Sequence, residues 1–321
     1  MKASANPCRR CIKPFRMKRA LLTLDYLKAA EGLGGWNEAA GIRTESEKDF
    51  GRKTAGWPAG NDLKGLAAYF RSWPESAISL TAGMMAVRIK ACPFFEGLIS
   101  LGLTKDEIKD LSSLLCLEEY FVQGFNPSFD FSIINCLMRG DPDCRFEIKG
   151  HEASAAEKLE FDESCPARAE GRTCPADTFG ALTARYTVDL KKLSEVGEVS
   201  DRQQQAIRIR YLSAKAGGEL LAKKADRTDL EGLVKYYWSK FPNVSCRLEE
   251  GTLICEALTC ALATGLEELS VIGTTGLSHM ACICDEAAIA GFNSEIFFQQ
   301  SRNLLDGDKA CRWELRLKTS R

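Results

Sequence analysis

The chain has 321 residues, of which 45% are hydrophobic and 27% charged, and its formal net charge is −1. This length predicts two domains of roughly 150 residues each, and the balanced charge argues against nucleic acid or an anionic membrane surface as a partner. No run of about 18 apolar residues occurs, so no membrane span is expected. The basic N-terminus, MKASANPCRRCIKPFRMKRALL, lacks the continuous apolar stretch of a signal peptide.

The chain contains 14 cysteines. Without an export signal, free thiols in a reducing cytoplasm are expected rather than a disulfide framework. The pair Cys8 and Cys11 has C-x-x-C spacing, which leaves a metal site or unpaired thiols open. A zinc site would need two more ligands, and the other close pair outside the repeats, Cys165 and Cys174, has a loose spacing.

Residues 1–61 are predicted to be an N-terminal extension, with a helix over 19–41 and a glycine-rich stretch after it. An amphipathic helix is then predicted over 62–72, DLKGLAAYFRS, and again over 229–239, DLEGLVKYYWS. Six of these 11 positions are identical at an offset of 167 residues. Asp62 or Asn61 is expected to cap the first helix, and Thr228 with Glu231 has the pattern of a capping box for the second.

The same offset relates the ends of the two copies, 124–149 and 291–316. Ten of 26 positions are identical, and both segments finish with a period-two strand after a Gly-Asp turn. The chain is therefore predicted to be a tandem duplication of an α+β unit, with helices first and an antiparallel hairpin after them. The two copies are expected to pair as an intramolecular pseudo-dimer.

The middle of each copy, 76–122 and 243–289, aligns less clearly, and two registers compete. One register pairs Gly83 with Gly251 and Cys92 with Cys260, whereas the other pairs Cys92 with Cys255. The predicted organisation is then an extension (1–61), a first repeat (62–149), a linker (150–180) and a second repeat (181–318) whose clearest helix begins at DRQQQAIRIRYL.

The endings GDPDCRF and GDKACRW, each preceded by a cysteine three residues before an acid, resemble the L-2-amino-thiazoline-4-carboxylic acid hydrolase family. They are more distantly similar to 4-vinyl reductase-type ligand-binding domains, which share the GD..C.F ending. The resemblance covers 62–149 and 200–318. In the second repeat the family pattern falls on Cys255, on GLEEL from Gly265, and on Cys282 with Asp285.

In the first repeat the pattern falls on Cys92, on GLTKDEI from Gly102, and on Cys116 with Glu119, where Glu is a departure from Asp. The resemblance implies hydrolysis of a small cyclic amidine, a non-peptide C–N bond. The alternative is a non-catalytic sensor that holds a small hydrophobic or tetrapyrrole-like ligand. No cofactor is required by the sequence, and a divalent metal stays open.

A spacing of three places Cys116 with Glu119, and Cys282 with Asp285, on one face of a helix. A carboxylate raises the pKa of a neighbouring thiol, so an acid/base role for the carboxylate is chemically easier than a nucleophilic role for the cysteine. The alternative is a purely structural one, in which the cysteine is a small buried residue and the acid lies on the surface. His279, three residues before Cys282, completes a Cys–His–Asp arrangement in the second repeat alone.

Cys144 and Cys311 begin the last strands, where they either pack in the core or line a pocket with Cys92 or Cys255. Asp141 and Asp308 are expected to bond nearby backbone N–H groups as turn residues. A metal site formed by three cysteines of one repeat, Cys92, Cys116 and Cys144 or Cys255, Cys282 and Cys311, is a weaker possibility. Arg312, and Arg145 in the first repeat, are available to hold a substrate carboxylate.

Overall fold

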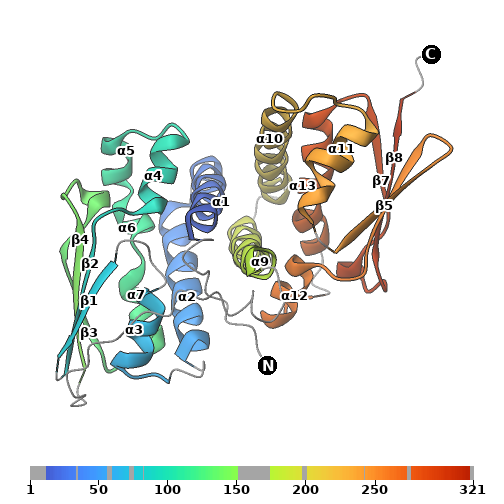
Figure 1. Cartoon of the computed structure of the whole chain (residues 1–321). Helices are drawn as coiled ribbons and strands as arrows, with labels where there is room; N and C mark the ends of the chain where they lie inside the picture. Colours follow the sequence, from blue (N-terminus) through green and yellow to red (C-terminus); the bar gives the residue numbers. More distant parts are fainter. Residues whose placement is uncertain are drawn as a thin grey trace. The chain divides into compact units, whose positions relative to one another are not determined.

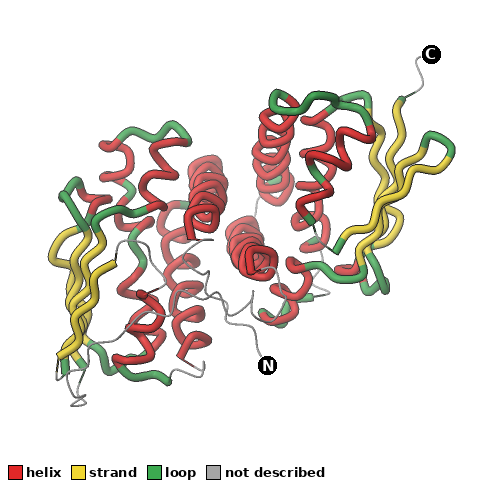
Figure 2. The backbone as a smooth tube through the Cα atoms, viewed as in Figure 1, coloured by secondary structure: helices red, strands yellow, loops and turns green. Residues whose placement is uncertain are grey.

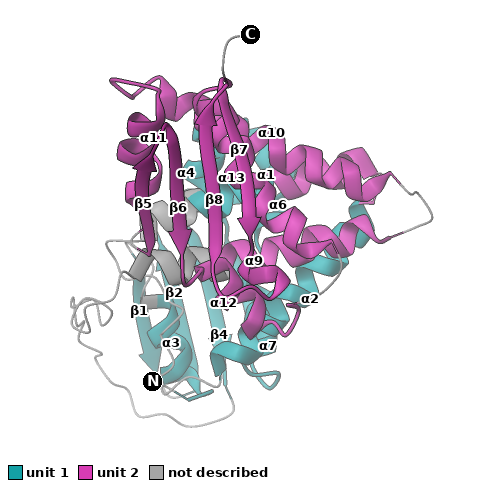
Figure 3. Ribbon diagram, turned by 90° about the vertical axis from the view of Figure 1, so that its right-hand side faces the viewer, with its two compact units in different colours: residues 1–24, 36–178 teal, residues 25–35, 179–321 magenta. Residues whose placement is uncertain are grey.

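The computed structural model describes residues 12–33, 35–55, 60–71, 76–81, 83–150, 174–196, 201–241, 243–272 and 276–318. These residues fall into two compact units, one within 1–24 and 36–178 and one within 25–35 and 179–321 (Figure 3). Each unit combines helices with a four-stranded antiparallel sheet, which confirms the predicted α+β class and the two repeats (Figure 1, Figure 2). The predicted pseudo-dimer stays a prediction.

The described part of the chain begins with α1 (Ile12–Leu33), whose residues up to Leu24 belong to the first unit and whose later residues belong to the second. The first unit continues through long and short helices and four strands. Its remaining helices are α2 (Trp36–Ala55), α3 (Leu63–Arg71), α4 (Pro93–Ser100), α5 (Lys105–Asp110), α6 (Ser112–Leu115) and α7 (Glu118–Phe125). Its strands are β1 (Ser76–Thr81), β2 (Met84–Ile89), β3 (Asp130–Asn135) and β4 (Cys144–Lys149), with a 3-10 turn at Leu137–Arg139.

The second unit repeats the order of the first, except that no separate helix of its described residues corresponds to α5. Its helices are α9 (Cys174–Ser194), α10 (Arg202–Ala222), α11 (Leu230–Tyr236), α12 (Ala261–Glu268) and α13 (Leu277–Phe292), and its strands are β5 (Val244–Glu249), β6 (Thr252–Ala257), β7 (Ile296–Arg302) and β8 (Cys311–Leu317). Two 3-10 turns lie at Trp238–Lys240 and Leu304–Asp306. The single helix α13 stands where the first unit has α6 and α7 with a break between them.

The two sheets have the same topology, β1-β2-β4-β3 and β5-β6-β8-β7. A register shift also recurs, between Ile133 and Asn135 in β3 and between Gln300 and Arg302 in β7. Both predicted hairpins are therefore confirmed. On the last strands buried and exposed positions alternate, so that one face of each sheet packs on the helices.

Two glycines recur at equivalent positions in each unit because they lie where two helices cross. A Cβ atom on Gly51 of α2 would lie 2.1 Å from the carbonyl oxygen of Phe121, and a Cβ on Gly218 of α10 would lie 2.0 Å from that of Ala288. Their partners across the crossing, Gly124 and Gly291, are equally confined. Helices α2 and α7, like α10 and α13, therefore cross with their backbones in contact, which a side chain larger than hydrogen would prevent.

The starts of the repeated helices are capped by aspartates in both units. Asp62 Oδ1 accepts a hydrogen bond from the N–H of Gly65 at 2.8 Å, as predicted. In the second unit the capping-box prediction was wrong: Asp229 Oδ1 accepts from the N–H of Gly232 at 2.9 Å, and Glu231 pairs with Arg227 instead. The aspartate alone satisfies the free amide of the first turn.

The structure settles the register that the sequence left open. Gly83 and Gly251 both have positive φ, at 75° and 78°, in the hairpin turns. Cys92 and Cys260 are the residues just before α4 and α12, so they are the equivalent pair and Cys255, which lies within β6, is not. The same alignment pairs Gly265 with Gly97, so the expected match of GLEEL to GLTKDEI was wrong.

The helices also correct two predicted boundaries. The glycine-rich stretch before residue 61 is largely helical, because α2 extends to Ala55. It packs on α7 as α10 packs on α13, so it belongs to the repeat and is not an extension of it. Helix α9 begins at Cys174, inside the expected linker, whereas residues 151–173 lie outside the described part.

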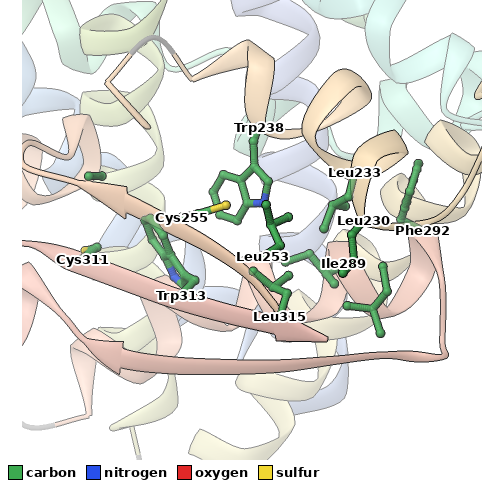
Figure 4. Close-up of a cluster of buried hydrophobic side chains, with 12 residues drawn as sticks. Leu230, Leu233, Trp238, Leu253, Cys255, Ile289, Phe292, Cys311, Trp313 and Leu315 are labelled. Carbon is green, nitrogen blue, oxygen red and sulfur yellow. The ribbon is translucent and has the colours of Figure 1, made fainter. Parts of the chain in front are cut away.

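The core of the second unit lies between the sheet and helices α11 and α13. Figure 4 shows Trp238 above the sheet, next to Cys255, with Trp313 on the strand below. The two indole rings are 4.9 Å apart between centroids. Leucines and isoleucines fill the rest of the layer, among them Leu233, Leu253, Ile289 and Leu315, each at most 2% exposed.

Candidate functional site

Each unit brings three cysteines from distant segments to the same end of its sheet. One cysteine precedes the short helix after the first hairpin, one lies before or within the next helix, and one begins the last strand. These are Cys92, Cys116 and Cys144 in the first unit and Cys260, Cys282 and Cys311 in the second. The surroundings of the two sets differ between the two units.

In the first unit the cysteines enclose a small, mostly apolar cavity of about 20 Å³. Cys136 joins the three repeat cysteines in its lining, and its Sγ lies 3.1 Å from that of Cys116. The backbone N–H of Leu137 donates to Cys144 Sγ at 3.3 Å. The volume suffices for about one water molecule, so no substrate with a ring fits there.

Two thiols of this cavity, Cys116 and Cys144, are held in their neutral form, whereas hydrogen bonds from both of them lower the pKa of Cys136 to about 3. Hydrogen bonding to Cys136, burial and the nearby Glu118 carboxylate raise the pKa of the Cys116 thiol well above its usual value. Hydrogen bonding to Cys136 and burial likewise raise the pKa of Cys144. Neither thiol is therefore an activated nucleophile near neutral pH.

The predicted pair of Cys116 and Glu119 is not formed. Cys116 lies in the break between α6 and α7, with ψ of 88°, so the three-residue spacing does not follow a helix. Glu119 is exposed and accepts a hydrogen bond from Gln123 at 3.2 Å. The carboxylate that lines the cavity is Glu118, and α7 and α13 align so that Glu118 is the equivalent of Asp285.

In the second unit Cys282 and Cys311 share Asn303 as a partner. Cys282 Sγ lies 3.8 Å and Cys311 Sγ 3.9 Å from Asn303 Oδ1, and the N–H of Leu304 donates to Cys311 at 3.4 Å. Burial, followed by the nearby Asp285 carboxylate, raises the pKa of Cys282. Burial raises the pKa of Cys311 to about 11, and it raises the pKa of Cys260 as well.

Asp285 lies on the same helix as Cys282 and accepts a hydrogen bond from the hydroxyl of Tyr237 at 2.7 Å. Burial and this carboxylate raise the pKa of Tyr237 well above its usual value, so the phenol stays protonated and donates. The first unit has Phe70 at the position of Tyr237. The hydrogen bond from a phenol to this carboxylate is therefore specific to the second unit.

A pocket of about 380 Å³ opens beside Cys282 in the second unit. Helix α13 contributes His279, Cys282 and Glu286 to its wall, and β7 contributes Gln300 and Arg302. The remaining lining residues are Ser278, Ile283, Phe298, Ser301, Asn303, Asp306 and Asp308. The volume lies in the range typical of small-ligand sites.

The expected Cys–His–Asp arrangement is realised only in part. His279 and Cys282 line the pocket together, one helical turn apart on α13. Asp285 is absent from the lining and is engaged with Tyr237. His279 is exposed and has no side-chain partner among the described residues, so it meets the solvent of the pocket directly.

The two arginines expected to hold a carboxylate lie on the opposite face of their sheets. Cys311 and Trp313 face the helices, so Arg312 between them points outward, where its Nε donates to Glu314 at 3.1 Å. Arg145 points outward in the same way and donates to Asp143 at 3.0 Å. Neither side chain is directed at the cysteines.

Arg302 lines the pocket instead, and the sequence interpretation missed it. The register shift at the end of β7 interrupts the alternation of faces there. A signal was present in the repeat itself, because Ile133, Ile134, Asn135 and Cys136 of the first unit correspond to Gln300, Ser301, Arg302 and Asn303 of the second. Two isoleucines and a cysteine of the first copy are thus replaced by polar residues in the second.

Cys255 belongs to the core and not to this site. It is fully buried on β6 among Trp238, Leu253 and Trp313, and its Sγ lies 2.8 Å from that of Cys246 on the neighbouring strand. The counterpart of Cys92 is Cys260, so the assignment of the family pattern to Cys255 does not match the structural alignment of the two units. The aspartates of the turns behave as predicted: Asp141 and Asp308 accept hydrogen bonds from the N–H groups of Cys136 and Asn303, both at 2.7 Å.

No group of His, Cys, Asp and Glu side chains within the described ranges has the arrangement of a metal site. Cys8, Cys11 and Cys165, named as weaker metal candidates, lie outside those ranges. None of the helices that the structure describes has both the length and the apolarity needed to cross a bilayer. A comparison with models of known protein families gave no match, and a comparison with curated proteins gave none either.

Proposed function

We propose that the second unit is a hydrolase site for a small cyclic amidine that carries a carboxylate, as in L-2-amino-thiazoline-4-carboxylate. The observation that supports this most is the asymmetry of the two units. The second has a polar pocket of about 380 Å³ at its cysteines, whereas the first has a cavity of only about 20 Å³ at the equivalent place. On this proposal the first unit is structural.

The charges of the pocket fit a zwitterionic ring. Arg302 is exposed and has no side-chain partner in the described part of the chain, so its guanidinium is free to bind a carboxylate with two hydrogen bonds. Glu286, Asp306 and Asp308 supply negative charge to the same pocket. A protonated amidine is a planar cation that such carboxylates bind.

The chemistry proposed here proceeds through water and not through a thiolate. The raised pKa of Cys282 keeps that thiol protonated near neutral pH. His279 can instead accept a proton from water as the water oxygen bonds to the amidine carbon. The tetrahedral adduct then collapses with opening of the ring, and the proton passes from His279 to the leaving heteroatom.

Ring opening followed by mass spectrometry tests the proposal. The full chain is incubated with L-2-amino-thiazoline-4-carboxylate in reducing buffer, and turnover is compared between the wild type and His279→Gln. We expect kcat/KM to fall by about 100-fold or more, because a general base contributes roughly that factor. Glu119→Gln, an exposed change in the first unit, is the matched control and leaves kcat/KM unchanged.

Three outcomes contradict the proposal in different ways. Equal activity of His279→Gln and wild type removes the assigned base. Loss of activity in Glu119→Gln at unchanged stability places the reaction in the first unit. Binding of the compound by calorimetry without turnover favours the non-catalytic ligand-binding alternative.

A further inference from the structure

The hairpin of β5 and β6 places two cysteines directly opposite each other. Its turn consists of Glu250 and Gly251, with φ of 48° and 78°, which is the type I′ geometry of a two-residue hairpin loop. The residues that flank such a loop, Glu249 and Thr252, form a hydrogen-bonded pair. In an antiparallel hairpin, hydrogen-bonded and non-hydrogen-bonded pairs alternate along the strands. Cys246 and Cys255 are the third pair beyond Glu249 and Thr252, so they form a pair without backbone hydrogen bonds between them.

This position is the one at which opposite side chains approach most closely. The Cα atoms of such a pair are about 4.5 Å apart, which lies within the range that a disulfide requires, roughly 4.4–6.8 Å. The two Sγ atoms are 2.8 Å apart. A bond of about 2.05 Å therefore needs a shift of the sulfur atoms by less than about 1 Å and no movement of the strands.

The pair is specific to the second unit. The equivalent residues of β1 and β2 are Ile78 and Val87, which are opposite each other in the same register. Packing at this place is thus satisfied by two aliphatic side chains, and the fold does not require sulfur. The second unit has two thiols in contact where the first has an ordinary cross-strand pair.

Access to the pair is one-sided. Cys255 is fully buried, with its sulfur next to the Trp238 ring (Figure 4). Cys246 is half-buried on β5, which is the edge strand of the sheet. A reagent in solution therefore meets Cys246 first, and Cys255 is in place behind it.

We propose that Cys246 and Cys255 form a reversible dithiol–disulfide site that a low-molecular-weight disulfide oxidises. The thiolate of Cys246 attacks the reagent disulfide, forming a mixed disulfide and releasing one thiolate. Cys255 then loses its proton and displaces the second thiolate as the Cys246–Cys255 bond forms. Two thiols of the protein are oxidised, and one reagent disulfide is reduced to two thiols.

The protonation behaviour of the pair agrees with this order of attack. Hydrogen bonding with Cys255 lowers the pKa of Cys246, which favours the thiolate at the accessible position. Hydrogen bonding with Cys246, together with burial, raises the pKa of Cys255. The buried thiol therefore acts second, after the first exchange has removed the neighbouring negative charge.

The experiment uses the full chain and glutathione disulfide as the oxidant. The protein is equilibrated with oxidised and reduced glutathione in several ratios, free thiols are alkylated, and the cysteine peptides are quantified by mass spectrometry. We expect a peptide pair linked through Cys246 and Cys255 that dithiothreitol reverses. Peptides of Cys116 and Cys136, whose sulfur atoms are 3.1 Å apart, are quantified in the same digest.

Two variants separate this site from general oxidation. Cys255→Ser lacks the second thiol, so a glutathione adduct is expected to accumulate on Cys246 at least tenfold above wild type. Cys246→Ile with Cys255→Val copies the first unit, so it folds and shows neither adduct nor link. The linked wild type is expected to melt about 5 °C higher than the reduced protein, a difference that the double variant lacks.

The inference is overturned if Cys246 and Cys255 both stay alkylatable in pure glutathione disulfide while Cys116 and Cys136 become linked. It is also overturned if Cys255→Ser carries no adduct on Cys246. The experiment needs no substrate, so its result is independent of the hydrolase proposal.

Discussion

The two units share one backbone plan and differ in what they bury. In the first, four cysteines and apolar side chains close around a cavity of about 20 Å³. In the second, polar residues on β7 leave a pocket of about 380 Å³ at the same end of the sheet. A duplicated fold can therefore keep its helix crossings and strand registers while only one copy keeps room for a ligand.

Both units depend on a close crossing of two helices, and a substitution at this crossing is expected to change stability the most. Gly218→Ala places a Cβ atom 2.0 Å from the carbonyl oxygen of Ala288. We expect it to lower the free energy of unfolding by about 3 kcal/mol, measured by urea denaturation, because the helices must separate. Gly51→Ala is expected to cost a similar amount in the first unit, where the same contact is 2.1 Å.

The adjacent glycine is the control for this prediction. A Cβ atom on Gly217 meets no atom within 4 Å. Gly217→Ala is therefore expected to raise the free energy of unfolding by about 0.5–1 kcal/mol through helix propensity alone. Equal changes in the free energy of unfolding for Gly218→Ala and Gly217→Ala would contradict the close contact between the two helices.

A buried arginine marks a second difference between the units. Arg43 on α2 pairs with Glu47 at 2.6 Å, and both side chains are buried. Its equivalent Arg210 is 3% exposed, donates through Nη2 to Cys284 Sγ at 3.2 Å and leaves Nε without a hydrogen-bond partner. Ala214 stands where the first unit has Glu47.

Restoring the acid should therefore stabilise the second unit. Ala214→Glu places a carboxylate one turn after Arg210, and we expect the free energy of unfolding to rise by about 1 kcal/mol. Ala214→Gln, which has the same size but no charge, is the matched control with a smaller gain. A loss of stability in Ala214→Glu alone would show that the site does not accept the ion pair.

The first unit has its own buried charge, which makes its stability sensitive to acid. Asp143 is 2% exposed, and hydrogen bonds from Asn135, Arg88 and Arg145 lower its pKa to about 2. The contribution of the carboxylate is fully present above its ordinary pKa near 4 and is lost as the pH falls toward 2. The second unit has Ala310 at this position.

Unfolding by urea between pH 6 and pH 2.5 checks the difference. The stability advantage of the wild type over Asp143→Asn is expected to be constant above about pH 5 and to shrink below about pH 4. This is the smallest of the expected effects, because both arginines are nearly half exposed. An advantage that does not change with pH would contradict the lowered pKa.

Much of the fold could be predicted from local periodicity. The last strands alternate buried and exposed residues, and the helices at 62–72 and 229–239 have a regular apolar face, so both elements were identified. Helix α2 was missed because its pattern is interrupted by Gly41 and Gly51. Gly51 is required by contact with a helix distant in sequence, which no local pattern shows.

The site was predictable in its residue types and less so in its geometry. His279 and Cys282 were identified together because α13 is continuous between them. The same spacing failed at Cys116, where the equivalent segment breaks between α6 and α7. Arg302 was missed because a register shift at the end of β7 interrupts the regular alternation of faces, and register shifts depend on the partner strand.

Whether the second unit alone holds the ligand can be tested by comparing the two cavities in one spectrum. Ile283 lines the pocket of the second unit and Ile133 lines the cavity of the first, so labelled isoleucine methyl groups report on each by NMR. Ile283→Val and Ile133→Val assign the two signals. On titration with L-2-amino-thiazoline-4-carboxylate we expect the Ile283 signal to shift and the Ile133 signal to stay in place. A shift of Ile133 alone, or of neither signal, would contradict the claim that the second unit holds the ligand.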